Sequence, residues 1–488
     1  MRRLLALVPL TLLFAALPGS ALAAEPGVHS PNLSYIKNLP YGPKNGGVKN
    51  YGTDIEFARI GGRQYAFAGS YKNGMQIVDV QSPTNAKIAS VYDCGVTQGD
   101  IQVFRQADEP GRLFVAYTSD TFGDGTSGCY RDAKALGFDV LKPNGTGKNG
   151  TFIADVTNPL APKTVSFVEF TQGSHNQTVH PSGNYLYNSN SDLITSIQPA
   201  IEIADISNPA NPRHAGELSL PTRPGLGTES HDISFNKKGN RAYSAALSQG
   251  VIIDTTKPAE PKIVTSFVDP AINVWHQAEK FTLTGADGAK RDFLIVEDEF
   301  AGAVGTGQCP NGGVHVFDIT GENEKNPVKV GYWNIDEIRP TASATDSCTA
   351  HVFDIHERQK VMTIAYYNGG VRVVDLSGLM GISLGDSTQV GGPGMREIGY
   401  YRTENGDGKG NADSWSAKTP YIGANGNFYL YGNDISRGLD VYKFDGSKPT
   451  SENAGTWLTP KQAEALTAGR PKVALSGDTA FFCLLPQN

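Results

Sequence analysis

Apolar and polar residues alternate in a short phrase that recurs along this chain. Its clearest copy is GGVRVVDL at residues 369–376, in which a glycine and alternating apolar residues lead to Asp375. Further copies begin at Gly74, Thr151, Ala200, Gly250, Gly312 and Gly438. Such alternation predicts a β-strand, and the prolines that follow five of the seven copies predict tight turns. The closing aspartates recur every 49–76 residues, so the phrase indicates an internal repeat of the propeller or solenoid kind.

Each repeat contains four expected strands, which is typical of a β-propeller blade. In the first repeat they fall at residues 53–60, 64–70, 74–80 and 87–92. Seven such repeats have opening strands that begin near Asp54, Asp100, His175, His231, His276, His351 and Thr419. We therefore predict an all-β, seven-bladed propeller of four-stranded blades. Long loop insertions are expected at 120–150, 300–312, 321–347 and 377–418, which are rich in Gly, Asn, Ser or Asp.

Four segments are expected along the chain. Residues 1–23 are interpreted as a signal peptide, with Arg2 and Arg3, an apolar run and a small-residue cleavage site at Ala23. Residues 24–50 are expected to be an irregular lead-in, 51–445 the propeller, and 446–488 a tail with one short helix at 458–468. No later stretch is apolar enough to span a membrane, so we expect a soluble protein that is secreted or extracytoplasmic.

Charge and cysteine content narrow the classes of partner. The formal charge of −7 becomes −9 once the two signal-peptide arginines are removed, which argues against nucleic acid or an anionic membrane surface. We expect a monomer that binds an unknown protein or small molecule on its loop-rich face. An exported chain can form disulfides, and we predict the pairs Cys94–Cys129 and Cys309–Cys348, with Cys483 free.

The opening residues of the blades are the most informative candidates for chemistry. The first strand of each blade lines the central channel, so equivalent positions meet around the axis. Four of the nine histidines fall at this position on four consecutive blades, namely His175, His231, His276 and His351. Neutral imidazole is the commonest ligand of zinc, copper or iron. We therefore predict a transition-metal site made of these four histidines, with Asp54 and Asp100 facing the ion from the open side.

A plainer interpretation stands beside the metal site. Polar residues are ordinary in a water-filled propeller channel, and histidines there can simply bind water. The neighbouring Glu229, Asp232 and Glu279 are candidates for contacts that support the ligands. The aspartates that close the repeat strands are predicted to bond their own turn backbone rather than a metal.

The repeats resemble the LVIVD repeat family. VTNPLAP from Val156 and ISNPANP from Ile206 match the family pattern closely, and VQSPTNA from Val80 and TTKPAEP from Thr255 match it well. The resemblance extends over nearly all of residues 50–445. It implies a β-propeller, typically on secreted or surface proteins, and implies little about activity.

Two classes of function follow. One is a secreted binding or interaction propeller with a metal site at the channel mouth. The other is a metal-dependent oxidoreductase whose ion is held by the four histidines, and axial histidines on a propeller resemble in architecture those of carotenoid-cleaving oxygenases. The catalytic residues are unknown at this stage. The chain shows no GxSxG, phosphate-binding loop or CxxC motif, which disfavours a serine- or cysteine-based hydrolase.

Overall fold

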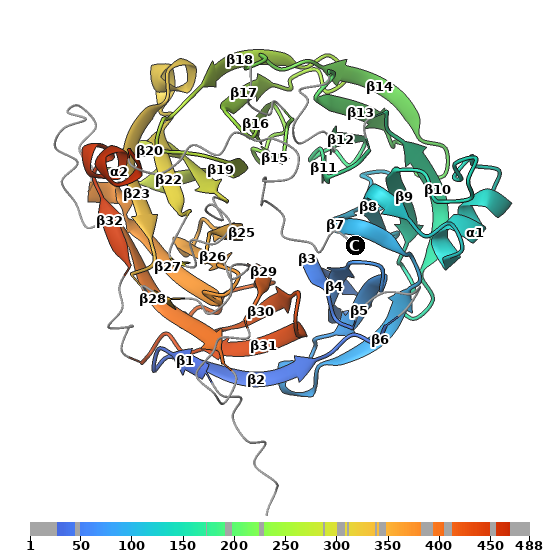
Figure 1. Ribbon diagram of the computed structural model, residues 1–488, viewed down its shortest axis with the longest axis horizontal. Coiled ribbons are helices and arrows are strands. Elements are labelled where there is room, and N and C mark those ends of the chain that lie inside the picture. The colour runs from blue at the N-terminus through green and yellow to red at the C-terminus, as the bar shows by residue number, and fades with distance from the viewer. Residues whose placement is uncertain are drawn as a thin grey trace, which may run out of the picture.

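Seven antiparallel sheets stand around a central channel, and Figure 1 shows their innermost strands facing the middle of the ring. The computed structural model describes residues 27–43, 49–171, 173–190, 198–223, 229–285, 288–299, 308–309, 312–336, 339–340, 348–381, 394–404, 412–448 and 455–468. The prediction of a seven-bladed propeller built from four-stranded blades is confirmed.

The first four blades each use four strands in chain order. Blade 1 contains β3 (Gly52–Ile60), β4 (Arg63–Ser70), β5 (Met75–Asp79) and β6 (Lys87–Tyr92). Blade 2 contains β7 (Val96–Phe104), β8 (Phe114–Gly123), β9 (Gly150–Asp155) and β10 (Lys163–Glu169). Blade 3 contains β11 (Asn176–Val179), β12 (Tyr185–Ser189), β13 (Ile201–Asp205) and β14 (Arg213–Leu218). Blade 4 contains β15 (Asp232–Phe235), β16 (Arg241–Ala245), β17 (Gly250–Asp254) and β18 (Lys262–Phe267).

The last three blades also take strands from elsewhere in the chain. Blade 5 contains β19 (Trp275–Thr284), β20 (Lys290–Asp298), β22 (Val314–Asp318), β23 (Val328–Asn334) and β32 (Thr456–Leu458). Blade 6 contains β25 (His351–His356), β26 (Val361–Ala365), β27 (Val371–Gly378), β28 (Gly394–Thr403) and β1 (Gly27–His29). Blade 7 contains β29 (Ser414–Lys418), β30 (Phe428–Asp434), β31 (Gly438–Phe444) and β2 (Leu33–Leu39).

The remaining elements are short. They are α1 (Gly128–Ala135), α2 (Pro460–Thr467), three 3₁₀ turns (Pro83–Asn85, Gly321–Lys325, Leu379–Gly381) and a separate pair, β21 (Gln308–Cys309) with β24 (Arg339–Pro340). All four segments expected as loops therefore contain regular structure. The 120–150 segment contains α1, 300–312 contains β21, 321–347 contains β23, and 377–418 contains β28 and β29. Polar or glycine-rich residues flank these elements, so the sequence pattern indicated loops instead.

The repeated phrase forms the third strand of each blade, where both faces are buried. In β17 the residues Gly250 to Ile253 are buried, whereas the outermost β18 is largely accessible. Adjacent blades pack face to face, so both faces of the inner strands read as apolar. Between blades 3 and 4, for example, Ile203, Tyr187 and Ile253 belong to one buried cluster.

The aspartates that close these strands organise the turns that follow. Oδ1 of Asp155 accepts a hydrogen bond from the backbone N–H of Thr157 at 2.9 Å. The same contact, two residues on, is made by Asp79, Asp205, Asp254, Asp318 and Asp375 at 2.8–3.1 Å. An acceptor that holds the backbone two residues on fixes a tight turn. The prediction that these aspartates serve their turns is confirmed.

Residues near the N-terminus close the ring, which differs from the irregular lead-in expected over 24–50. Strand β2 adds to the outer edge of blade 7 by pairing with β31, with Leu33 opposite Phe444. In Figure 1 the blue β2 lies along the orange-red β31. The tail returns to blade 5, where β32 pairs with β23 and Trp457 lies opposite Trp333. The expected helix is α2, with Thr459 as its N-cap.

A disulfide joins Cys94 to Cys129 of α1, with a Cα–Cα distance of 5.0 Å, as predicted. Cys348 is also disulfide-bonded. The side chain of Cys309 and the whole of residues 1–26 and 469–488, including Cys483, lie outside what the structure describes. The pairing Cys309–Cys348 and the signal peptide therefore stay predictions.

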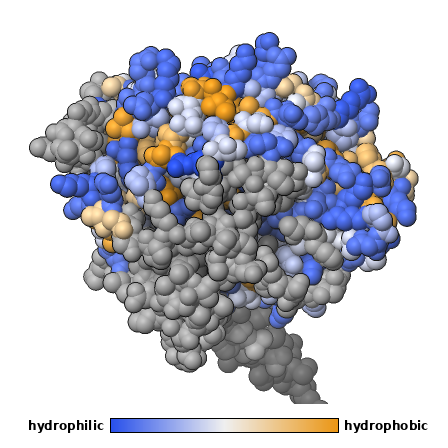
Figure 2. Space-filling view, turned by 45° about the horizontal axis from the view of Figure 1, so that its top comes forward, coloured by the Kyte–Doolittle hydropathy of each residue, from blue (hydrophilic) through white to orange (hydrophobic). Residues whose placement is uncertain are grey.

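The described surface in Figure 2 is largely hydrophilic, with apolar residues in small groups. The exposed large apolar side chains, such as Leu136, Leu160 and Tyr421, come from different elements, and scattered exposure of this kind is normal. Across the described ranges, no helix has the length and apolar character needed to cross a bilayer.

Candidate metal centre

The four predicted histidines lie at the same end of four neighbouring inner strands. His276 and His351 belong to β19 and β25, and His175 and His231 directly precede β11 and β15. The backbone N–H groups of His175 and His231 donate to the carbonyl oxygens of Ser189 and Ala245 on the next strand of the same blade. The sheet ladder therefore places these imidazoles at equivalent points around the channel.

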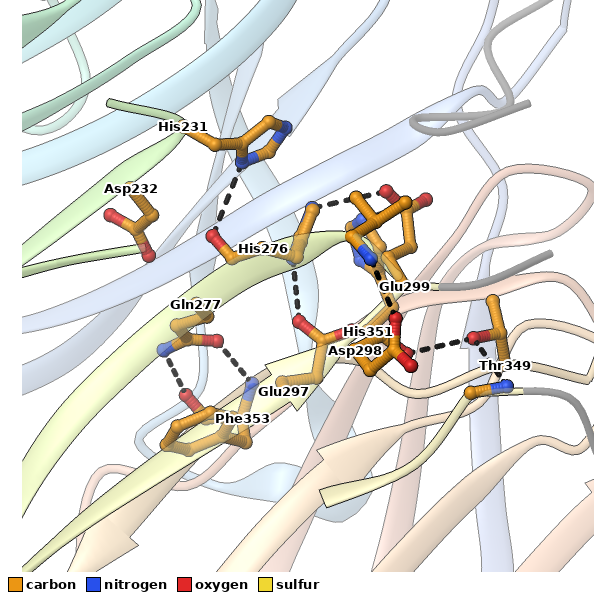
Figure 3. Close-up of polar contacts among 12 residues, drawn as sticks. His231, Asp232, His276, Gln277, Glu297, Asp298, Glu299, Thr349, His351 and Phe353 are labelled. Atoms are coloured by element: carbon orange, nitrogen blue, oxygen red, sulfur yellow. Dashed lines mark hydrogen bonds and ion pairs between the residues drawn. The ribbon is translucent and has the colours of Figure 1, made fainter. Parts of the chain in front are cut away.

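The imidazoles form a continuous row around the axis. Ring centroids are 4.4 Å apart for His175 and His231, 4.2 Å for His231 and His276, and 4.4 Å for His276 and His351. All four side chains are buried, at most 2% exposed. The expectation that the four rings come together is met, and His231, His276 and His351 can be followed in Figure 3.

Each imidazole is held through its Nδ1 atom by a different acceptor. Nδ1 of His231 donates to the carbonyl oxygen of His276 at 3.2 Å, and Nδ1 of His351 donates to that of Trp415 at 2.5 Å. The Nδ1 atoms of His175 and His276 are 2.9 and 2.5 Å from carboxylate oxygens of Asp120 and Glu297. Metal-bound histidines typically use one ring nitrogen for such a contact and the other for the metal. The Nε2 atoms are therefore the candidate ligand atoms, and Nε2 of His175 lies 3.4 Å from the side-chain Nε2 of Gln98.

Two buried carboxylates complete the candidate ligand set. His175, Glu229 and His231 bring ligand atoms within 4.8 Å of one another, and so do His231, His276 and Glu299. The oxygens of Glu299 also lie 3.5 Å from Nε2 of His276 and 3.7 Å from Nε2 of His351. Among the residues with known placement, these two overlapping groups are the clusters compact enough for a metal ion.

Burial favours the neutral, metal-binding form of His231, His276 and His351. Desolvation, together with the neighbouring histidines, holds the pKa of His231 and of His276 well below the usual value. Burial lowers the pKa of His351 to about 3. The pKa of Glu297 is raised well above its usual value by burial and by the nearby carboxylates of Glu299 and Asp298. A bound cation would offset this repulsion.

Aromatic side chains enclose the His351 end of the row. The Trp415 ring lies 4.4 Å and the Tyr367 ring 4.7 Å from the His351 ring, measured between centroids. The hydroxyl of Tyr367 donates to Oε1 of Glu299 at 2.7 Å. The blade 7 neighbour of His351 is therefore Trp415 and not Thr419, which follows the end of β29. The predicted starting point of that strand was too late in the chain.

The predicted carboxylates Asp54 and Asp100 have other contacts. Oδ1 of Asp54 is 2.8 Å from Nζ of Lys418, and Asp100 accepts the backbone N–H of Gln177 at 3.0 Å. Both line a channel cavity of about 190 Å³ together with His276 and His351. Neither belongs to the two compact groups found among the described residues, so their role as ligands stays a prediction.

Sequence reasoning named Glu229 as a supporting residue and did not find Glu299, Glu297 or Asp120. Glu297 ends β20 with Asp298, Glu299 follows that strand, and Asp120 lies in β8. All three lie in or directly after the second strand of a blade, one strand away from the channel lining. The acidic run Glu297-Asp298-Glu299, at the end of an apolar strand, could have indicated these residues. The second strand of a blade ends beside the start of its first strand, where the histidines lie.

Comparisons with known proteins agree with the fold. Residues 175–218 match the LVIVD repeat family model. No curated protein matches the chain. Among solved structures, the periplasmic gluconolactonase of Pseudomonas aeruginosa is 11% identical, with a TM-score of 0.49 over 83% of this chain and 96% of that one. A putative 6-phosphogluconolactonase from Bacteroides fragilis is 10% identical, with a TM-score of 0.44 over 83% of this chain and 97% of that one. Similarity at this level carries no functional argument.

Proposed function

We propose that this protein is a metal-dependent propeller enzyme of the oxidoreductase class. One transition-metal ion would be bound through Nε2 of His175, His231 and His276, with Glu229, Glu299 and His351 beside it. The observation that carries the proposal is the arrangement of four buried imidazoles, each anchored at Nδ1, with two buried carboxylates close to their ring nitrogens.

The ligand set favours copper, iron or zinc. Imidazole suits these ions, whereas magnesium and calcium prefer oxygen ligands throughout. Copper or iron would supply one-electron chemistry in a site from which bulk water is excluded by burial. The chain's own contribution would be to fix the imidazoles by their Nδ1 contacts and to hold Glu299 through Tyr367.

The architecture supports a functional rather than a structural role for the ion. Each blade is held by its own antiparallel strand pairing, and β2 closes the ring without help from the channel. The cavity of about 190 Å³ reaches His276 and His351, so a small molecule could approach the ion. These features favour catalysis over simple structural binding.

A binding or interaction propeller is the second candidate function. A groove of about 920 Å³ between blades 4, 5 and 6 favours it, with Lys237, Arg241 and Glu357 among its lining residues. In this case the metal would organise the channel and a partner would occupy the groove.

Export is part of the proposal. The Cys94–Cys129 disulfide supports an oxidising compartment outside the cytoplasm. Edman sequencing of the mature protein would check the predicted cleavage near Ala23; a mature protein that retains Met1 would contradict it.

The function is tested by metal analysis and spectroscopy of the exported protein. We expect about one transition-metal ion per chain and, for copper or iron, an electron paramagnetic resonance signal that changes on addition of ascorbate. Zinc at full occupancy would contradict the oxidoreductase class but would still support the proposed metal site. Protein purified without chelators that holds no transition metal would contradict both.

A further inference from the structure

The channel next to the histidines is lined by an excess of carboxylates. The cavity of about 190 Å³ is bordered by Asp54, Glu56, Asp100, Asp232, Glu279 and Asp354. Apart from the histidines, the basic side chain among its described lining residues is Lys418. Carboxylates that share a low-dielectric cavity repel one another unless some are protonated or a cation lies among them.

Half of these carboxylates already have a basic partner. Nζ of Lys418 is 2.8 Å from both Asp54 and Glu56, and Asp354 is 3.2 Å from Nε2 of His356. Asp100 and Asp232 instead accept backbone N–H groups, from Gln177 at 3.0 Å and from Ile233 at 2.6 Å.

Three carboxylates therefore lack a cationic partner. Within the described chain, no basic side chain forms an ion pair with Asp100, Asp232 or Glu279. Burial and the carboxylate of Asp354 raise the pKa of Glu279 well above its usual value, and Lys418, already paired with Asp54 and Glu56, opposes this shift only in part.

An independent acceptor lies at the histidine end of the same cavity. Gln98 is 3% exposed and lines the cavity, and its Oε1 atom has no hydrogen-bond partner among the described residues. Its Nε2 atom is 3.4 Å from Nε2 of His175. A buried hydrogen-bond acceptor without a donor lowers the stability of the folded protein. Both ends of the cavity therefore favour a ligand rich in N–H donors.

A bare metal ion does not fit these carboxylates. Among the described residues, the groups with three ligand atoms within 4.8 Å are the two histidine–glutamate groups, and none of the channel acids belongs to them. Calcium needs six to eight oxygens at about 2.3–2.6 Å. The ligand must therefore be longer than a single ion. A cavity of about 190 Å³ has room for a small organic molecule, since a cavity of about 150 Å³ can bind benzene.

We infer that the channel cavity binds a small organic cation with protonated amino groups, held by Asp100, Asp232 and Glu279. One end of this molecule would lie beside His276 and His351; Figure 3 shows Asp232 and Gln277 on the strands that carry His231 and His276. Entry is through the groove of about 920 Å³, because Phe235 and Glu279 line both the groove and the cavity. A role for this amine as the substrate rests on the proposed oxidoreductase function. The binding of the amine does not depend on that function.

Calorimetric titration with 1,4-diaminobutane tests the inference, with butane-1,4-diol as the neutral molecule of equal length. The chelator-treated and the metal-loaded protein are titrated separately. We expect the diamine to bind both forms at one site and the diol to bind at least about tenfold more weakly, because one lost charged contact costs about a factor of ten. Equal affinity for the diol, or no diamine binding to either form, would overturn the inference.

Two variants locate the site. Glu279→Gln and Asp232→Asn keep the side-chain shape and should each weaken diamine binding about tenfold, whereas Glu217→Gln on the exposed face of β14 should leave it unchanged. Diamine affinity that is equal in all three variants would place the amine elsewhere. If the protein purified without chelators holds no transition metal but binds the diamine, the proposed function is refuted and this inference stands; stoichiometric metal in that protein without diamine binding would do the reverse.

Discussion

Nδ1 of His276 and Oε2 of Glu297 lie 2.5 Å apart, and both side chains are fully buried beside the channel. The contact comes from two strands of one blade, β19 and β20, which pair over their whole length. It fixes the plane of the imidazole and directs Nε2 toward Glu299, 3.5 Å away. A residue outside the proposed ligand set can thus set the orientation of one within it.

Changing Glu297 to Gln should therefore weaken metal binding without removing a ligand. The amide keeps an acceptor for Nδ1 but loses the negative charge that makes the imidazole more basic, and such contacts typically contribute about 10–100-fold in affinity. Competition with a chromophoric chelator measures the change. Glu217→Gln, on the exposed β14, is the matched control. Equal affinity in wild type and Glu297→Gln would show that this contact does not tune a metal ligand.

His231 is shared by both compact ligand groups, so its loss should be decisive. We expect His231→Ala to abolish stoichiometric metal while the far-ultraviolet circular dichroism spectrum stays unchanged, because the blades are held by strand pairing. His214→Ala is the control, since His214 is exposed on β14. Plasma mass spectrometry gives the metal content; full occupancy in His231→Ala would remove this residue from the site.

The fold could be predicted from the sequence because every blade repeats the same pattern of strand and turn. The phrase ending in Asp155 or Asp254 combines a strand buried on both faces with an aspartate that fixes the next turn, so it recurs visibly. Strand β2 escaped prediction because it belongs to no repeat: Leu33 pairs with Phe444 from the other end of the chain. A pairing over such a separation leaves no local pattern.

The site was only partly accessible for a related reason. One repeat position is occupied by His175, His231, His276 and His351. The repeat pattern alone therefore predicted that these histidines lie close together. Glu299 and Asp120 lie one strand away from the histidines, at matching register positions of blades 5 and 2. Their proximity to the histidines depends on how the second strand of a blade ends. The blade 7 residue beside His351 is Trp415 and not the predicted Thr419. The first strand of that blade begins earlier than its polar residues suggested.

Ring closure by β2 should contribute strongly to stability. Leu33 is fully buried in a cluster with Tyr442 and Phe444, and truncating such a leucine to alanine typically costs about 2–5 kcal/mol. We expect Leu33→Ala to lower the unfolding free energy by this amount in urea titrations. Leu136→Ala is the control, because Leu136 is 56% exposed. A loss below about 0.5 kcal/mol, the usual size for a surface change, would show that β2 does not hold the ring.

Asp434 should make the metal-free protein less stable as pH rises. Burial and the carboxylate of Asp440 raise the pKa of Asp434 from 3.8 to about 7. Between these values the folded protein retains a proton that the unfolded chain has lost, so the unfolding free energy falls with increasing pH, by at most about 1.4 kcal/mol per pH unit. Urea titrations from pH 4 to 8 should give a shallower slope for Asp434→Asn than for wild type. Identical slopes in the two proteins would contradict the assignment; Asn in place of the exposed Asp108 is the control.

X-ray absorption at the metal edge tests the central claim most directly, because it reports the atoms bound to the ion in the wild-type protein. The account predicts about one copper, iron or zinc ion per chain, a first shell of nitrogen or oxygen at about 2.0–2.2 Å and the outer-shell scattering of at least three imidazole rings. An absence of transition metal in the purified protein, or a spectrum with no imidazole scattering, would contradict it.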